Sequence, residues 1–208
     1  MYMDLAQLFN HYGSDKDRNG YSPLYHTLFH RLKNEPINLL EIGIGTMIPG
    51  VHSSMVGYSL PGYAPGGSLR AWRDYFPNGR IIGMDVQTDT LLGGEERIET
   101  YLCDSRNSTL VKLCIMPMLQ HIKFDIIIDD GSHAADSQFK TLENFYPHLK
   151  PGGIYIIEDI HPGSQVSTDP NIMKGIVGGD PFFFVGLKNN QCVIFKSHLD
   201  SKHEFPSN

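Results

Sequence analysis

Residues 38–45 read NLLEIGIG, an apolar run that ends in two glycines. Short apolar runs bounded by turn residues are typical of strands that are buried on both faces of a parallel sheet. Glycine lets the backbone approach a ligand that a β-carbon would exclude. The stretch therefore predicts a strand over Asn38–Ile42 and a ligand near Gly43 and Gly45.

Similar runs recur along the chain and alternate with helical patterns. We expect further strands at Arg80–Asp85, Ile98–Leu102, Phe124–Asp129 and Ile154–Glu158, and a last pair at Pro181–Leu187 and Gln191–Lys196. The last two runs flank Asn189-Asn190, and asparagine tolerates positive φ, so they predict a tight antiparallel hairpin. The sequence thus predicts an α/β fold with a doubly wound, mostly parallel seven-stranded sheet that ends in this hairpin.

Helices and loops are expected between the strands. Apolar residues at helical spacing predict helices over Ser68–Phe76 and Ser137–Leu149, and Ser22-Pro23 is typical of a helix start with serine as the N-cap. Two glycine- and proline-rich stretches, Thr46–Gly67 and His161–Gly179, are expected to be long loops at the carboxyl ends of strands. Open α/β sheets bind their ligands there, and the second loop is expected to act as a lid.

The length of 208 residues suits one domain with a sizeable core. We expect a helical segment over residues 1–37 that packs on the core, followed by a ligand-binding domain over 38–208. This length leaves little room for a separate substrate domain. A homo-oligomer in which a partner subunit completes the acceptor pocket therefore stays open.

Composition excludes several classes of protein. The net charge of −6 and the lack of a long basic run argue against a nucleic-acid partner. No apolar stretch approaches the ~20 residues that a membrane helix needs, and Met1–Asn10 lacks the pattern of a signal peptide. The three cysteines are scattered, as is typical of reduced thiols. We therefore expect a soluble cytoplasmic protein without membrane partners.

Polar residues at the ends of the next two strands suit a nucleoside. Asp85 ends the second strand, where a carboxylate can accept both hydroxyl hydrogens of a ribose. Asp104 and Ser105 follow the third strand and are candidates to accept from an adenine amino group. A nicotinamide site would need a glycine-rich turn that opens directly into a helix, with its acid about 20 residues on. Here a long loop follows Gly45, which favours an adenosyl ligand without a pyrophosphate.

S-Adenosylmethionine is such a ligand, and its sulfonium is cationic. An acidic rim formed by Glu41, Asp129 and Asp130 would suit that charge.

A second acidic group follows the fourth and fifth strands. Asp129 and Asp130 end one strand, His133 follows closely, and Glu158 and Asp159 end the other. If these strands are neighbours, four carboxylates and a histidine meet at one edge, with no lysine or arginine inside either segment. Like charges brought together are costly unless a cation joins them, and oxygen ligands suit Mg²⁺ or Mn²⁺.

These features resemble the class I S-adenosylmethionine-dependent methyltransferases, from about Asn38 to the final hairpin. The resemblance is carried by EIGIG at 41–45, by Asp85 and Asp104, and by LKPGG at 149–153, although Met47 stands where many relatives have a third glycine. It implies a Rossmann-like methyltransferase fold. The cofactor-binding residues that it implies are Glu41, Gly43, Gly45, Ser68, Asp85, Asp104, Ser105 and Asp129.

A narrower resemblance is to the metal-dependent O-methyltransferases that modify sugar hydroxyls, including those of macrolide antibiotics. It rests on DGSH at 130–133, Glu158-Asp159, GSLRAW at 67–72 with YFP at 75–77, and YGSDK at 12–16. The resemblance implies that Asp130, Glu158 and Asp159 hold the metal and that His133 is the general base. It also implies a sugar-like small-molecule acceptor.

Other interpretations stay open at this point. Asp129 and Asp130 could merely cap the following helix, and Lys16 and Tyr21 are further candidates to line the site. The acceptor could be catechol-like or an antibiotic, because two neighbouring oxygens there also chelate a metal. In another class altogether, the chain could be a non-catalytic module that binds an adenosine ligand.

Overall fold

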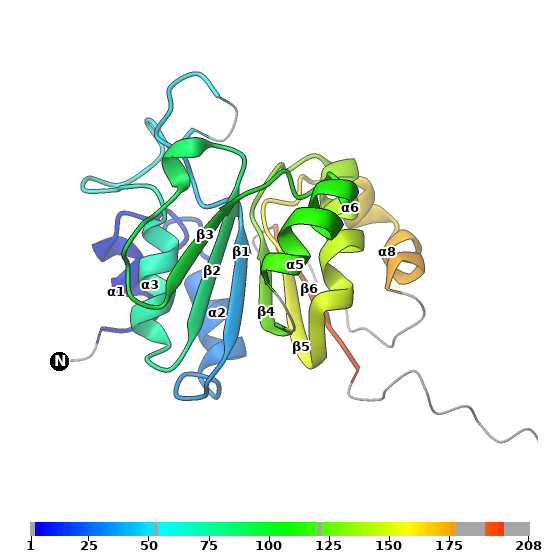
Figure 1. Ribbon diagram of the computed structural model, residues 1–208, viewed down its shortest axis with the longest axis horizontal. Helices are drawn as coiled ribbons and strands as arrows, with labels where there is room; N and C mark the ends of the chain where they lie inside the picture. The colour runs from blue at the N-terminus through cyan, green and yellow to red at the C-terminus, as the bar shows by residue number, and fades with distance from the viewer. Residues whose placement is uncertain (1–2, 52–53, 120–121, 178–189, 198–208) are drawn as a thin grey trace, which may run out of the picture.

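The computed structural model describes residues 3–51, 54–119, 122–177 and 190–197. Within these residues six strands form one sheet in the order β3-β2-β1-β4-β5-β6 (Figure 1). The first five strands run parallel, and β6 runs antiparallel beside β5. The strands are β1 (Asn38–Ile42), β2 (Arg80–Asp85), β3 (Ile98–Leu102), β4 (Phe124–Asp129), β5 (Leu149–Ile157) and β6 (Cys192–Phe195).

Helices cover both faces of this sheet (Figure 1). One face carries α1 (Leu5–His11), α2 (Ser22–Phe29) and α3 (Gly67–Tyr75). The other face carries α4 (Ser108–Leu110), η2 (Val111–Ile115), α5 (Met116–Met118), α6 (Ala135–Phe145), α7 (Gln165–Thr168) and α8 (Pro170–Ile176). Two short 3₁₀ turns, η1 (Thr88–Thr90) and η3 (Tyr146–His148), lie in connections.

Successive strand residues alternate between the two helical layers. Leu40 and Ile42 of β1 belong to the apolar cluster under α5 and α6, whereas Leu39 belongs to the cluster under α1, α2 and α3. Both sets of side chains are almost completely buried. This double burial explains why the strand sequences are continuous apolar runs, and it confirms the doubly wound fold.

Aromatic rings fasten the N-terminal helices to the sheet. Trp72 of α3 meets Phe9 of α1 edge-on at 4.9 Å between ring centroids, and it meets Tyr25 of α2 at 5.1 Å. Phe29 stacks on Tyr25 at 5.5 Å, and all four rings are fully buried. The segment before β1 is therefore part of the same core as the sheet.

The sheet differs from the expected one in its strand number and in the bounds of β5 and β6. β5 ends at Ile157 rather than Glu158, and β6 covers Cys192–Phe195 within the expected Gln191–Lys196. The described residues form six strands, because the expected strand Pro181–Leu187 lies outside them. β5 begins at Leu149, five residues before the expected start at Ile154, because the chain passes through Pro151 and Gly152 without leaving the sheet. A register shift in β4 between Phe124 and Ile126 accommodates this irregular start.

Two helix boundaries also differ. The helix expected over Ser137–Leu149 runs over Ala135–Phe145 and then tightens into η3, because Pro147 has no amide to continue the α-helical pattern. Ser22 is not the N-cap of α2 but its first residue, since Tyr21 already has helical angles and occupies the cap position. Pro23 does lie in the first turn, as expected.

The stretch expected as a long loop at His161–Gly179 is largely helical. Its described part contains α7 and α8, and Val166, Met173 and Val177 are buried in the apolar cluster beside α6. Their packing anchors the described part of this segment to the core, and its expected role as a lid stays a prediction. Among the described residues, no helix is both long and apolar enough to cross a membrane.

Candidate active site

A cavity of about 780 Å³ lies at the carboxyl ends of the parallel strands. β1 and β4 are neighbours, with Ile42 paired to Asp129, and their connections leave in opposite directions at this point. Such a switch in strand order opens a crevice above the sheet. The cavity is lined by residues that follow β1 through β5, together with residues 14–19 and parts of the segment 54–63.

The turn after β1 needs glycine because a β-carbon there would clash with other parts of the protein, apart from any ligand. Gly43 has φ +81°, and a β-carbon there would lie 2.1 Å from the main-chain oxygen of Asp130. Gly45 has φ +76°, and its β-carbon would lie 2.2 Å from the hydroxyl of Tyr63. That hydroxyl donates to the carbonyl oxygens of Ile44 and Gly45, so it fixes the turn where the cavity begins.

The residues expected to bind a nucleoside line one side of the cavity. Asp85 is buried and accepts hydrogen bonds from the amides of Ile44 and Gln87, both at 3.0 Å, so it already stabilises the loop. Ser68 lies at the start of α3 and is also buried. The structure thus brings Ser68 and Asp85 to the same cavity as Gly43 and Gly45.

Asp104 and Ser105 line the far end of this side. Asp104 pairs with Arg106 at 2.9 Å, and this hydrogen bond lowers the pKa of the Asp104 carboxyl. The hydroxyl of Ser105 is 2.8 Å from that of Thr141. Both residues therefore already have partners, and an adenine would have to share them.

The expected acidic rim is only partly formed. Glu41 and Asp130 line the cavity, but Asp129 is not among its described lining residues and lies behind them. Asp129 is 2% exposed, and burial raises the pKa of its carboxyl to about 8. Its Oδ1 accepts from the amide of Gly131, which makes it a residue that shapes the turn after β4.

Lys16, a candidate from the sequence to line the site, lies between acids that were expected to have only a metal as their cation. Its ammonium lies 2.7 Å from Asp130 Oδ2, 2.6 Å from Glu158 Oε2 and 3.2 Å from Glu41 Oε1. Burial works to lower the pKa of Lys16, but the three carboxylates outweigh it and hold that pKa well above its ordinary value. The protein therefore supplies one positive charge of its own to these three carboxylates.

The two buried glutamates share Lys16 but differ in their other contacts. Glu41 accepts from the indole Nε1 of Trp72 at 2.7 Å, so Trp72 is both a core residue and a donor to the site. Burial raises the pKa of Glu158 to about 7, although Lys16 opposes that rise. Oε1 of Glu158 has no hydrogen-bond partner among the described residues.

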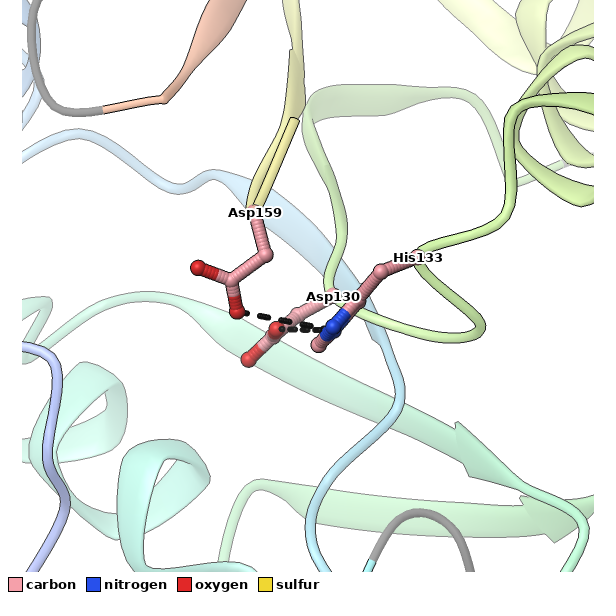
Figure 2. A group of neighbouring side chains, drawn as sticks. All are labelled: Asp130, His133 and Asp159. Carbon is pink, nitrogen blue, oxygen red and sulfur yellow. Dashed lines mark ion pairs between the residues drawn. The ribbon is translucent and has the colours of Figure 1, made fainter. Parts of the chain in front are cut away.

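Asp130, His133 and Asp159 form the open part of the acidic group (Figure 2). His133 Nε2 lies 3.5 Å from Asp130 Oδ1 and 3.5 Å from Asp159 Oδ2. The hydrogen bond to Asp130 is the main cause that raises the pKa of His133, while burial opposes it. All three residues line the cavity, and about a third of the His133 side chain is exposed.

The backbone of Asp159 carries strain that fits a functional position. Its φ of +50° is uncommon for a residue with a β-carbon, and it turns the chain sharply at the end of β5. The hydroxyl of Tyr21 donates to Asp159 Oδ1. Tyr21 thereby supports the side chain on the face away from His133.

Divalent cations suit this arrangement. Potential ligand atoms of Asp130, His133 and Asp159 all lie within 4.8 Å of one another. Glu158 precedes Asp159 in the chain but does not belong to this group. With Lys16 protonated and His133 neutral, one ammonium stands against four ionised carboxylates, which leaves three negative charges uncompensated; the carboxylates are Glu41, Asp130, Glu158 and Asp159. A dication would reduce this excess, and carboxylate oxygens are the ligands that Mg²⁺ and Mn²⁺ accept.

Sequence reasoning found the acids and the histidine but gave Lys16 and Tyr21 only a minor place. The motif YGSDK at 12–16 was the signal for Lys16. Tyr63 and Asp89 were not predicted from the sequence. Asp89 accepts hydrogen bonds from the amide of Met47 and from the hydroxyl of Thr46, and it thereby holds the loop after Gly45. Neither residue stands in a recognisable motif.

Comparison with curated proteins finds sugar-modifying methyltransferases. The chain is 37% identical over 159 residues to 8-demethyl-8-(2-methoxy-alpha-L-rhamnosyl)-tetracenomycin-C 3'-O-methyltransferase of Streptomyces olivaceus, a match to 76% of this chain and 37% of that protein. It is 34% identical over 174 residues to demethylmacrocin O-methyltransferase of Streptomyces fradiae, a match to 80% of this chain and 40% of that protein. The chain thus spans about 40% of the length of these relatives. No protein-family model matches it.

Solved structures agree with this similarity. The MycE methyltransferase from the mycinamycin biosynthetic pathway, in complex with Mg and SAH, superposes with a TM-score of 0.71 at 26% identity, covering 95% of this chain and 55% of that one. A putative ribosomal RNA methyltransferase from Plasmodium falciparum has a TM-score of 0.59 at 16% identity, and the match covers 89% of this chain and 97% of that one. This second similarity shows a shared fold alone.

Proposed function

We propose that this chain, which has the fold of class I methyltransferases and resembles the macrolide- and sugar-modifying O-methyltransferases, transfers a methyl group from S-adenosylmethionine to a hydroxyl. The acceptor that we propose is a sugar or a glycosylated small molecule, and the reaction is assisted by Mg²⁺ or Mn²⁺. The observation that carries the proposal is the group of Asp130, His133 and Asp159. This group lies in the same cavity as the glycine turn and Asp85.

The cofactor would lie along the first three strand ends. Its methionine part would lie over Gly43 and Gly45 near Glu41 and Ser68, its ribose at Asp85, and its adenine at Asp104 and Ser105. This path leads a sulfonium toward the acidic end of the cavity, where uncompensated negative charge favours a cation. Asp129, which is buried behind the cavity, would support the turn at Gly131.

The metal-binding residues that we propose are Asp130 and Asp159, with Glu158 beside them. A divalent ion bound there would supply Lewis acidity, which makes a hydroxyl easier to deprotonate. His133 would take the proton at Nε2, because this atom faces both aspartates from the wall of the cavity. The aspartates then stabilise the imidazolium that results.

A related solved structure supports the proposed acceptor, and the free thiols of this chain support the proposed compartment. One structure is MycE in complex with Mg, SAH and mycinamycin VI, at a TM-score of 0.73 and 24% identity. All three cysteines of this chain are free, as is usual in a reducing compartment, and we place the reaction in the cytoplasm. Residues 38–208 would form the cofactor-binding domain, with 1–37 as the segment that packs on it.

Two measurements, each made with and without Mg²⁺, test the proposal. One is a calorimetric titration with S-adenosylmethionine, and the other is an assay of methyl transfer to a glycosylated acceptor. We expect binding of the cofactor in both conditions and methyl transfer to a glycosylated acceptor only when the metal is present. Cofactor binding without any effect of the metal on transfer would keep the methyltransferase and reject the metal. Failure to bind the cofactor would reject the methyltransferase itself.

A further inference from the structure

One short segment, residues 16–21, reaches the acids at the ends of β4 and β5. Lys16 donates to Asp130, and Tyr21 donates to Asp159. The main chain links the two donors directly, because the amide of Tyr21 donates to the carbonyl oxygen of Lys16 at 2.9 Å. The Lys16 and Tyr21 side chains are buried, at 2% and 3% exposure.

Each aspartate is held in the same way. One carboxylate oxygen accepts from the segment 16–21, and the other faces His133 Nε2 (Figure 2). For Asp130, Oδ2 is on Lys16 and Oδ1 faces His133. For Asp159, Oδ1 is on Tyr21 and Oδ2 faces His133. The donors therefore determine which oxygen of each aspartate is presented to the cavity.

We propose that Lys16 and Tyr21 are positioning residues, which orient Asp130 and Asp159 toward a common divalent cation. The inference rests on the proposed function, since it concerns the same metal. Hydrogen bonds to the second oxygen of a ligating carboxylate restrict its rotation, so the ligand geometry exists before the ion arrives. Lys16 also contacts Glu41, and it thus joins the cofactor side of the cavity to the metal side.

Tyr21→Phe tests the Asp159 half of the inference, because it removes the hydroxyl and keeps the ring. Tyr25→Phe is the matched control, since Tyr25 lies on the adjoining helix and its buried hydroxyl has no partner among the described residues. The probe is Mn²⁺ alone, and its dissociation constant for the cofactor-free protein is measured from the electron paramagnetic resonance signal of free Mn²⁺. We expect Tyr21→Phe to weaken Mn²⁺ binding by about 10- to 100-fold and Tyr25→Phe to leave it unchanged.

Lys16→Arg tests the Asp130 half. The variant keeps the positive charge but replaces a compact ammonium by a planar fork, so it changes position more than charge. We expect weaker Mn²⁺ binding, by about 10-fold or more. Lys140→Arg on the exposed face of α6 is the control and should have no effect. If Lys16→Arg does not fold, the Tyr21→Phe result still decides the inference.

The outcomes separate this inference from the proposed function. Equal Mn²⁺ affinity in Tyr21→Phe and Tyr25→Phe would overturn the positioning role, whatever the activity of the variants. Absence of Mn²⁺ binding in the unmodified chain would overturn it as well, and would reject the proposed metal. Binding of S-adenosylmethionine, measured on the same samples without metal, reports on the methyltransferase independently of both results.

Discussion

At the residue scale, the proposed chemistry depends on His133, whose Nε2 lies 3.5 Å from both Asp130 and Asp159. We predict that His133→Ala leaves the affinity for S-adenosylmethionine unchanged and lowers turnover by roughly 10²- to 10⁴-fold, because the hydroxyl loses its proton acceptor. Calorimetry and initial rates measure the two quantities. The same turnover in the variant would dismiss His133 as the base.

Gly43 shows what a single β-carbon would do to the site. Gly43→Ala places that atom against the Asp130 main chain at φ +81°, whereas Gly50→Ala has nearly the same φ, +78°, with no atom within 4 Å. We predict that Gly50→Ala costs about 1 kcal/mol of unfolding free energy and that Gly43→Ala costs several times more, because it adds a main-chain clash. Denaturant unfolding of both variants checks this, and equal costs would show that the turn can relax.

At the scale of elements, the pairing of β2 with β3 contains a pH-dependent contact. Arg80 donates to Glu99 at 2.7 Å, and this hydrogen bond holds the pKa of Glu99 below its ordinary value, while burial opposes the effect. A lowered pKa in the folded state stabilises the protein above the unfolded pKa of about 4.3, and that stability disappears as the pH falls through the folded value.

The consequence is a prediction for Glu99→Gln. The variant should be less stable than the unmodified chain near pH 7, by less than about 1 kcal/mol because both side chains are about 40% exposed and screened by solvent. The difference in unfolding free energy should shrink toward zero as the pH falls below about 4. Urea titrations at several pH values measure it, and a difference independent of pH would contradict the assignment.

Elements buried on both faces were the most predictable. β1, β2 and β4 have the expected bounds, because their apolar runs are cut off sharply by polar residues and turns. The edge strand β3 also has the expected bounds, although only its first residue, Ile98, is buried. The start of β5 was mispredicted because Pro151 and Gly152, ordinarily breakers, are tolerated where the neighbouring strand shifts its register. Helices α7 and α8 were missed because they are short and their stability comes from tertiary packing.

At the scale of the whole molecule, the N-terminal helices and the sheet share one aromatic core. Phe29→Ala removes a fully buried ring between Tyr25 and Trp72, and we predict a loss of about 3–5 kcal/mol in unfolding free energy. Because the core is continuous, fluorescence of Trp72, the single tryptophan, and far-ultraviolet circular dichroism should report one coincident transition. An earlier transition by fluorescence would show that residues 1–37 unfold separately.

The only site residues whose proximity could be predicted are those that follow neighbouring strands of the sheet. Asp130 and Asp159 follow adjacent parallel strands, so the topology alone brings them together. Lys16 lies 114 residues from Asp130, and Tyr21 lies 138 residues from Asp159. Contacts of that separation depend on how α1 and α2 pack, which periodicity in a single sequence does not specify.

The sequence separation of 142 between Lys16 and Glu158 also orders events during synthesis. Lys16 and Tyr21 are synthesised early, before most of the chain has emerged from the ribosome. Glu158 and Asp159, the last of their acidic partners, appear only once β5 has left the exit tunnel, so the complete acidic group is among the last features of the nascent chain to form. A polypeptide stalled before that point lacks the acceptor of the Tyr21 hydroxyl and one of the three carboxylates that pair with Lys16.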